Sequence, residues 1–209
     1  YGNSTYKLTD SVYSDFPEFR ERVSNAEKSA LGSNVFERFP EMFYDEMPDD
    51  DNEYVKILGR IDNRRVIKWI KREYISDHPN HFKWKVFLPG ANGTGTLGET
   101  ISTPLAEGPL VGGTQTFISF GAFETQLEAE NLLKYIKTKF LRILLGVKKV
   151  THNNKTKDVW SKIPLQDFTE NSDIDWTKSI SEIDQQLYEK YGLSEDEISF
   201  IEGKAQPMD

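Results

Sequence analysis

Residues 115–146 read QTFISFGAFETQLEAENLLKYIKTKFLRILLG, and this stretch decides the fold class. It begins with a short strand-like run at residues 115–120. Thr125 and Glu128 then form a capping box, which opens a helix because each side chain bonds to the other residue's backbone N–H. An apolar stripe at helical spacing follows and ends at Gly146; its members are Leu132, Leu133, Ile136, Phe140, Ile143 and Leu144. The sequence therefore predicts a strand followed by one long amphipathic helix.

Upstream of this stretch, three further segments have the composition of strands. Residues 54–60 and 65–71 flank Asp62 and Asn63, a pair typical of a hairpin turn. Residues 82–88 alternate apolar and mostly basic side chains, which predicts a strand with one buried face. An apolar anchor cluster is expected before these strands, formed by Phe36, Phe39, Met42 and Phe43.

Two more capping boxes mark the C-terminal part, one at Ser179–Glu182 and one at Ser194–Glu197. They predict a helix that runs to about Tyr191 and a shorter helix that ends near Glu202. The predicted class is α+β: a short-stranded mixed β-sheet, one long amphipathic helix packed on it, and a C-terminal helical hairpin. We expect one domain over residues 1–165, best supported over 34–165, and an acidic helical extension over 166–209.

The bulk composition is that of a globular protein. The chain has 209 residues, of which 37% are hydrophobic and 29% are charged. No apolar run approaches the roughly 18 residues that span a bilayer, and the first residues do not resemble a signal peptide, so no membrane partner is expected. With no cysteine there is no disulfide framework and no thiolate zinc site, which fits a reducing compartment. The absence of an initial Met suggests a fragment of a longer polypeptide.

A glycine-rich segment at residues 90–98 contains Gly93, Gly95 and Gly98 in the spacing of the dinucleotide fingerprint G-x-G-x-x-G. That fingerprint needs a helix directly after the glycines, because the helical N–H groups bind the pyrophosphate. Pro104 and Pro109 lie where this helix would run. We therefore expect a mobile surface loop and no nucleotide site.

Positive charge is concentrated in two segments of an otherwise acidic chain. The net charge is −8 overall, but residues 54–90 carry nine basic and three acidic side chains. Residues 131–162 carry nine basic and one acidic side chain, whereas residues 163–209 carry three basic and twelve acidic ones. Such segregation favours local contact with a polyanion. The alternative is a pair of solvated faces with local ion pairs.

No convincing catalytic centre is visible in the sequence. The histidines, His78, His81 and His152, lack the spacing of a zinc site, and no nucleophile elbow is present. Glu53 and Lys56 have the wrong spacing for the D/E-x-K pair of a metal-dependent nuclease. We therefore expect no catalytic residue, no metal site and no cofactor within this chain.

Several short motifs, in this order, resemble the C-terminal part of Eco57I-like type II restriction-modification enzymes, an N6-adenine DNA methyltransferase family. The motifs lie at residues 36–43 (FERFPEMF), 85–89 (KVFLP), 98–104 (GETISTP), 114–118 (TQTFI), 129–140 (AENLLKYIKTKF), 164–169 (PLQDFT) and 171–176 (NSDIDW). The similarity extends to 182–184 (EID) and 190–193 (KYGL), so it covers most of the chain from about Asn34 onward.

The resemblance implies a division of labour within a bacterial, cytoplasmic enzyme. An upstream methyltransferase domain of the same chain would bind S-adenosylmethionine, and Mg²⁺ where the parent also cleaves DNA. The present chain would be the target recognition domain that reads double-stranded DNA. It would itself be non-catalytic, and the resemblance assigns no base-reading residues because recognition loops differ most within the family.

A DNA-recognition domain needs cations for phosphates and polar side chains for base edges. The first basic segment supplies the expected cations, which are Arg60, Arg64, Arg65, Lys68, Lys71, Arg72, Lys83 and Lys85. The glycine loop would order against the duplex and offer hydrogen bonds from Asn92, Thr94 and Thr96.

Two other functions remain open from the sequence alone. One is a self-contained Mg²⁺-dependent nuclease that uses Asp49, Asp50, Asp51 or Glu53. The other is a non-catalytic protein-interaction domain whose basic segments dock an acidic partner.

Overall fold

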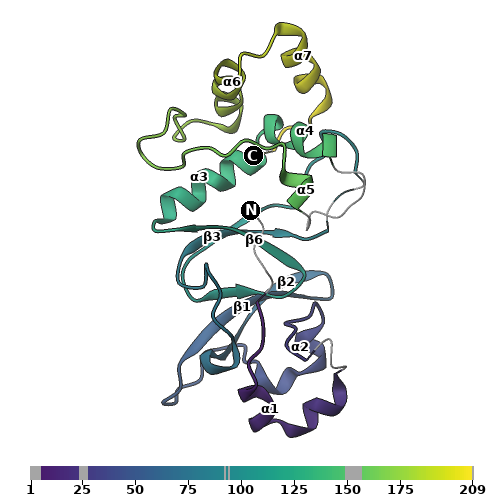
Figure 1. The fold of residues 1–209 in the computed structure, drawn as a ribbon, viewed down its shortest axis with the longest axis vertical. Helices are drawn as coiled ribbons and strands as arrows, with labels where there is room; N and C mark the ends of the chain where they lie inside the picture. Colours follow the sequence, from purple (N-terminus) through teal and green to yellow (C-terminus); the bar gives the residue numbers. More distant parts are fainter. Residues whose placement is uncertain (1–5, 24–27, 92, 94, 149–156, 209) are drawn as a thin grey trace.

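A computed structural model describes residues 6–23, 28–91, 93, 95–148 and 157–208 of the chain (Figure 1). Two three-stranded sheets occupy the middle of an elongated molecule. Short helices lie at one end and longer helices at the other (Figure 1). The predicted α+β class is confirmed, although the strands divide into two sheets rather than one.

The N-terminal part consists of short helical segments packed through aromatic rings. The segments are α1 (Ser11–Asp15), η1 (Pro17–Arg22), α2 (Val35–Arg38) and η2 (Pro40–Met42). The Phe19 ring stacks on Phe16 with a centroid distance of 4.7 Å and contacts Phe39 at 4.6 Å. The predicted anchor cluster is confirmed, since its four members are all buried.

The first sheet has the order β2-β1-β5 and contains the predicted hairpin. Its strands are β1 (Tyr54–Ile61), β2 (Arg64–Lys71) and β5 (Val111–Gly113), with β1 antiparallel to β2 and parallel to β5. The turn residues Asp62 and Asn63 have φ values of 49° and 61°. Two consecutive residues with positive φ define a type I′ turn, whose twist matches that of the two strands, so the predicted turn is confirmed. The short helix η3 (Arg72–Tyr74) follows β2.

The second sheet has the order β4-β3-β6 and joins the two halves of the core. Its strands are β3 (Trp84–Pro89), β4 (Leu105–Glu107) and β6 (Phe117–Phe123), and β3 is antiparallel to both neighbours. Successive side chains of a strand point to opposite faces. Val86 and Leu88 accordingly lie in the hydrophobic cluster beneath the C-terminal helices, whereas Phe87 lies in the N-terminal cluster.

The predicted long helix is divided into α3 (Gln126–Lys137) and α4 (Lys139–Lys148). Thr138 separates them in a non-helical conformation, with φ −58° and ψ 148°. The carboxylate of Asp184, on α6 (Ile180–Lys190), accepts hydrogen bonds from the N–H groups of Lys139 and Phe140 at 3.0 and 2.9 Å. Asp184 thereby caps the start of α4, and the expectation of one continuous helix is corrected.

Helix α3 lies on the second sheet, and the C-terminal helices pack on α3 and α4 (Figure 1). They are α5 (Lys157–Trp160), α6 and α7 (Glu195–Lys204), and the predicted capping boxes at Ser179 and Ser194 are present. Residues on both sides of position 165, from Val86 to Ala205, share one hydrophobic cluster. The domain boundary after residue 165 stays a prediction. Within the described ranges, no helix is long and apolar enough to cross a membrane.

Replacing Thr125 tests the capping box that opens α3. The Thr125 hydroxyl accepts from the Glu128 N–H at 3.3 Å, and the Glu128 carboxylate accepts from the Thr125 N–H at 3.0 Å. We expect Thr125→Ala to lower the free energy of unfolding by about 1 kcal/mol in urea denaturation. Thr100 is exposed, so Thr100→Ala is the matched control, with a change within about 0.5 kcal/mol. If both variants lost the same free energy of unfolding, Thr125 would not be the residue that caps α3.

Candidate nucleic-acid interface

The β1–β2 hairpin places two predicted DNA-contacting arginines directly opposite each other. Arg60 on β1 pairs with Arg65 on β2, so their side chains leave the sheet on the same face. Both guanidinium groups lie 5.8 Å from the centre of the Phe117 ring at the start of β6. Arg65 also donates a hydrogen bond to the backbone oxygen of Thr103. We call Arg60 and Arg65 the arginine pair.

The arginine pair carries positive charge that no carboxylate of the described residues neutralises through an ion pair. Burial lowers the pKa of Arg65, and the neighbouring charge of Arg60 lowers it further. The Nε atom of Arg60 is buried and finds no hydrogen-bond acceptor. Like charges opposite each other and an unsatisfied buried donor both cost stability. An anion bound at this face would relieve the repulsion between the two arginines.

The loop from Gly90 to Thr103, which contains the glycine-rich segment and is called the glycine loop below, has its two ends near the arginine pair. Gly90 donates its N–H to the Thr116 oxygen at 2.8 Å, next to Phe117. Thr103, at the other end, is the acceptor for Arg65. The structure therefore brings the loop ends and two of the predicted cations to one surface.

The interior of the glycine loop is organised by contacts within the protein. The Gly95 N–H donates to a carboxylate oxygen of Glu99 at 3.1 Å. Leu97 and Gly98 lie against Gly146 of α4 and Lys204 of α7, respectively. Thr96 is exposed, while Asn92 and Thr94 lie outside the described residues. No helix follows Gly98, as the two prolines predict.

Four of the eight predicted cations have a carboxylate partner. The ion pairs are Lys68–Asp45 at 2.6 Å, Lys71–Glu73 at 3.8 Å, Arg72–Asp77 and Lys83–Glu124. Lys68 and Arg64 also leave the hairpin on the face opposite to the arginine pair, because they lie an odd number of positions from Arg65. Arg64 is exposed beside the hairpin turn.

Lys85 is buried, and we remove it from the predicted interface. Its ammonium group donates to the backbone oxygens of Gly108 at 2.8 Å and His81 at 3.4 Å, and the side chain has no exposed surface. Burial lowers the Lys85 pKa to about 8. The alternation of residues 82–88 indicated a basic outer face, but this strand is the middle strand of its sheet and is covered at Lys85.

Sequence reasoning missed two residues of this surface, Lys56 and Phe117. Lys56 leaves β1 on the same face as Arg60, and its ammonium lies 5.0 Å from the centre of the Trp69 ring. Alternate residues of a strand share a face, so counting back from Arg60 in steps of two would have identified Lys56. The position of Phe117 beneath both arginines depends on the pairing of distant strands and has no local signal.

Asp50, one of the acidic residues considered for a nuclease, has a structural role. Its carboxylate accepts hydrogen bonds from the Asn52 N–H and the Tyr54 hydroxyl, both at 2.9 Å. Among the residues with described positions, no group of three or more His, Asp or Glu is arranged to hold a metal ion. His78 and His81 are buried in the core, and His152 lies outside the described residues.

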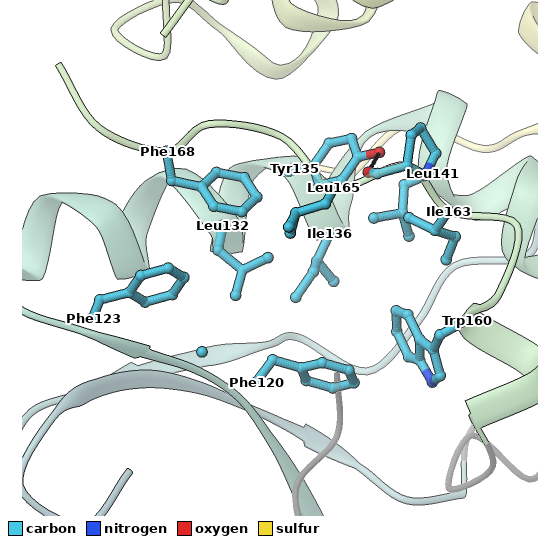
Figure 2. Close-up of a pocket in the computed structure, with 12 residues that line it drawn as sticks. Phe120, Phe123, Leu132, Tyr135, Ile136, Leu141, Trp160, Ile163, Leu165 and Phe168 are labelled. Carbon is cyan, nitrogen blue, oxygen red and sulfur yellow. Dashed lines mark hydrogen bonds between the residues drawn. The ribbon is translucent and has the colours of Figure 1, made fainter. Parts of the chain in front are cut away.

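A separate feature is an apolar cavity of about 250 Å³ between β6, α3 and the segment after α5 (Figure 2). Phe120, Leu132, Trp160 and Phe168 are among its walls, which are almost entirely apolar. The hydroxyl of Tyr135 reaches it but already donates to the Pro164 oxygen at 2.8 Å.

The chain is thus an α+β protein with two arginines side by side on a β-hairpin, neither of which has an ion-pair partner among the described residues. In comparisons with known proteins, no family model, no curated protein and no solved structure matches it. The similarity to Eco57I-like enzymes therefore stays a prediction.

Proposed function

We propose that this chain is a DNA target recognition domain and that the arginine pair contacts the phosphate backbone. The observation that carries the proposal is the pairing of Arg60 with Arg65 on one face without a carboxylate partner among the described residues. Guanidinium groups bind phosphate oxygens through two parallel hydrogen bonds. A DNA phosphate would reduce the repulsion between the two arginines.

The parent enzyme in this proposal is a bacterial, cytoplasmic restriction-modification protein that methylates adenine. The order of the short motifs supports this class. S-adenosylmethionine, and Mg²⁺ if the parent cleaves DNA, would be bound by other domains of the parent. The present chain would contribute positioning on the duplex through Lys56, Arg60 and Arg65, with Arg64 at the edge of the same hairpin.

The test is binding of a fluorescent mixed-sequence DNA duplex, measured by anisotropy between 50 and 200 mM salt. We expect the double variant Arg60→Gln/Arg65→Gln to weaken binding at least tenfold at about 50 mM salt. Each phosphate contact contributes about one unit to the slope of log affinity against log salt concentration. Loss of two contacts should therefore make this slope shallower by about two. Glutamine keeps much of the side-chain length, and circular dichroism verifies that the variant is folded.

The matched control removes the same charge from two exposed positions remote from the hairpin in sequence, Arg20 and Lys162. Arg20→Gln/Lys162→Gln should bind DNA within about twofold of the wild type. Arg60→Lys/Arg65→Lys should preserve the salt slope, because the charge is retained, but lower the affinity if the contact is bidentate. Absence of wild-type binding at 50 mM salt, or equal weakening in the control, would refute the assignment and favour an acidic protein partner.

A further inference from the structure

We propose that the apolar cavity beside β6 is a binding site for a small, neutral aromatic molecule. This site is independent of the DNA contact, because Arg60 and Arg65 do not line it. It is formed where β6 and α3 diverge, and the segment from Trp160 to Phe168 closes the remaining side (Figure 2).

The volume of the cavity sets the size of the ligand. A dry apolar cavity of about 150 Å³ is large enough to bind benzene. In the same proportion, the present 250 Å³ accommodates a molecule of about ten non-hydrogen atoms, such as two fused rings. Water is a poor occupant, since it needs at least two polar partners and the walls provide almost none.

The chemistry of the walls selects an uncharged ligand. The Tyr135 hydroxyl donates to Pro164 and lies 3.4 Å from the amide nitrogen of Gln166, so its hydrogen-bonding capacity is largely used. Among the described residues, no charged side chain lines the cavity. A phosphate, a carboxylate or a nucleobase would lose its hydration here without compensation.

The arrangement of the aromatic walls favours a flat ring. Phe120 and Trp160 lie at one end, with centroids 4.5 Å apart and planes inclined by 56°. Phe123 and Phe168 lie at the other end, 5.9 Å apart and nearly perpendicular (Figure 2). A ring bound between these pairs would meet both faces and edges of aromatic side chains, the contacts that aromatic rings prefer. Leu165 lines the cavity and is 78% exposed, which places an opening to solvent beside it.

The experiment uses the full chain with indene as the probe and benzoate as a charged molecule of similar size. We expect saturable indene binding with a dissociation constant on the order of 0.1–1 mM. At about ten times that concentration, Tm should rise by about 3 °C. Benzoate should leave Tm unchanged. In methyl NMR spectra, indene should shift the signals of Leu132, Ile136 and Ile163, which line the cavity.

Leu132→Phe fills the cavity and should abolish the response to indene. Leu133→Phe is the matched control, because Leu133 is adjacent on α3 and does not line the cavity. This variant should retain the response. If Leu132→Phe does not fold, the methyl spectra of the wild type show whether indene binds in the cavity. The proposal is overturned if indene produces no saturable effect up to its solubility limit, if benzoate binds equally well, or if only methyl groups outside the cavity respond.

Discussion

Asp184→Ala is expected to lower the free energy of unfolding by about 3 kcal/mol, which corresponds to a Tm decrease of roughly 9 °C for a chain of this size. The side chain is 1% exposed and caps α4 through the N–H groups of Lys139 and Phe140. Alanine leaves both donors without their acceptor, one of them buried and the other partly buried. Burial raises the pKa of Asp184 to about 6, while these two hydrogen bonds oppose that shift.

Asp184→Asn separates the loss of hydrogen bonds from the loss of charge. Its single carbonyl oxygen can still accept, so we expect a smaller loss of about 1 kcal/mol. Glu189 is exposed on the same helix, so Glu189→Ala is the control and should change stability by less than about 0.5 kcal/mol. Urea denaturation followed by circular dichroism measures all three. The capping assignment fails if Asp184→Ala is no more destabilising than Glu189→Ala.

His81→Leu is expected to stabilise the protein increasingly as the pH falls. The imidazole has no exposed surface, and neither ring nitrogen has a hydrogen-bond partner. Burial lowers the His81 pKa to about 4; the charges of Arg72, Lys85 and His78 add to the shift, and Asp77 opposes it. The unfolded chain binds this proton below about pH 6.5, whereas the native state binds it only near pH 4. Wild-type stability is therefore lost as the pH falls from 6.5 towards 4.

The measurement is urea denaturation of wild type and His81→Leu at pH 7.5 and 4.5. Leucine has a similar volume and leaves no polar atom unsatisfied, so the variant should be at least as stable at pH 7.5. We expect its advantage to grow by about 2 kcal/mol at pH 4.5, because the variant lacks the titrating group. A constant difference between the two pH values would show that His81 does not resist protonation in the native state.

The elements predicted correctly are those whose signals lie within a few residues. Asp62 and Asn63 define a type I′ turn by their own backbone preferences, and Thr125 with Glu128 opens α3 through contacts three residues apart. The break at Thr138 was not predictable in this way. The apolar stripe runs through it. The Thr138 hydroxyl accepts from the Leu141 N–H, but the acceptor for the first two N–H groups of α4 is Asp184, in a helix far along the chain.

In the candidate site, too, local features were predictable from the sequence and contacts between distant residues were not. The sequence located the basic segment, but the accessibility of each cation depends on neighbours brought from elsewhere. Lys83 meets Glu124 across 41 positions, and Lys68 meets Asp45 across 23. The sequence predicted Arg60 and Arg65 only as two of eight DNA-contacting cations. The strand register and the position of Phe117 single them out.

The sequence by itself determined the α+β class, the hairpin turn, the capped starts of α3, α6 and α7, and the two basic segments. These depend on backbone preferences and contacts between near neighbours. The tertiary structure alone decided that Lys85 is buried, that α3 and α4 are separate helices, and that a cavity remains beside β6. The physical reason is that burial and charge pairing depend on which distant surfaces pack together, and no local pattern encodes that contact.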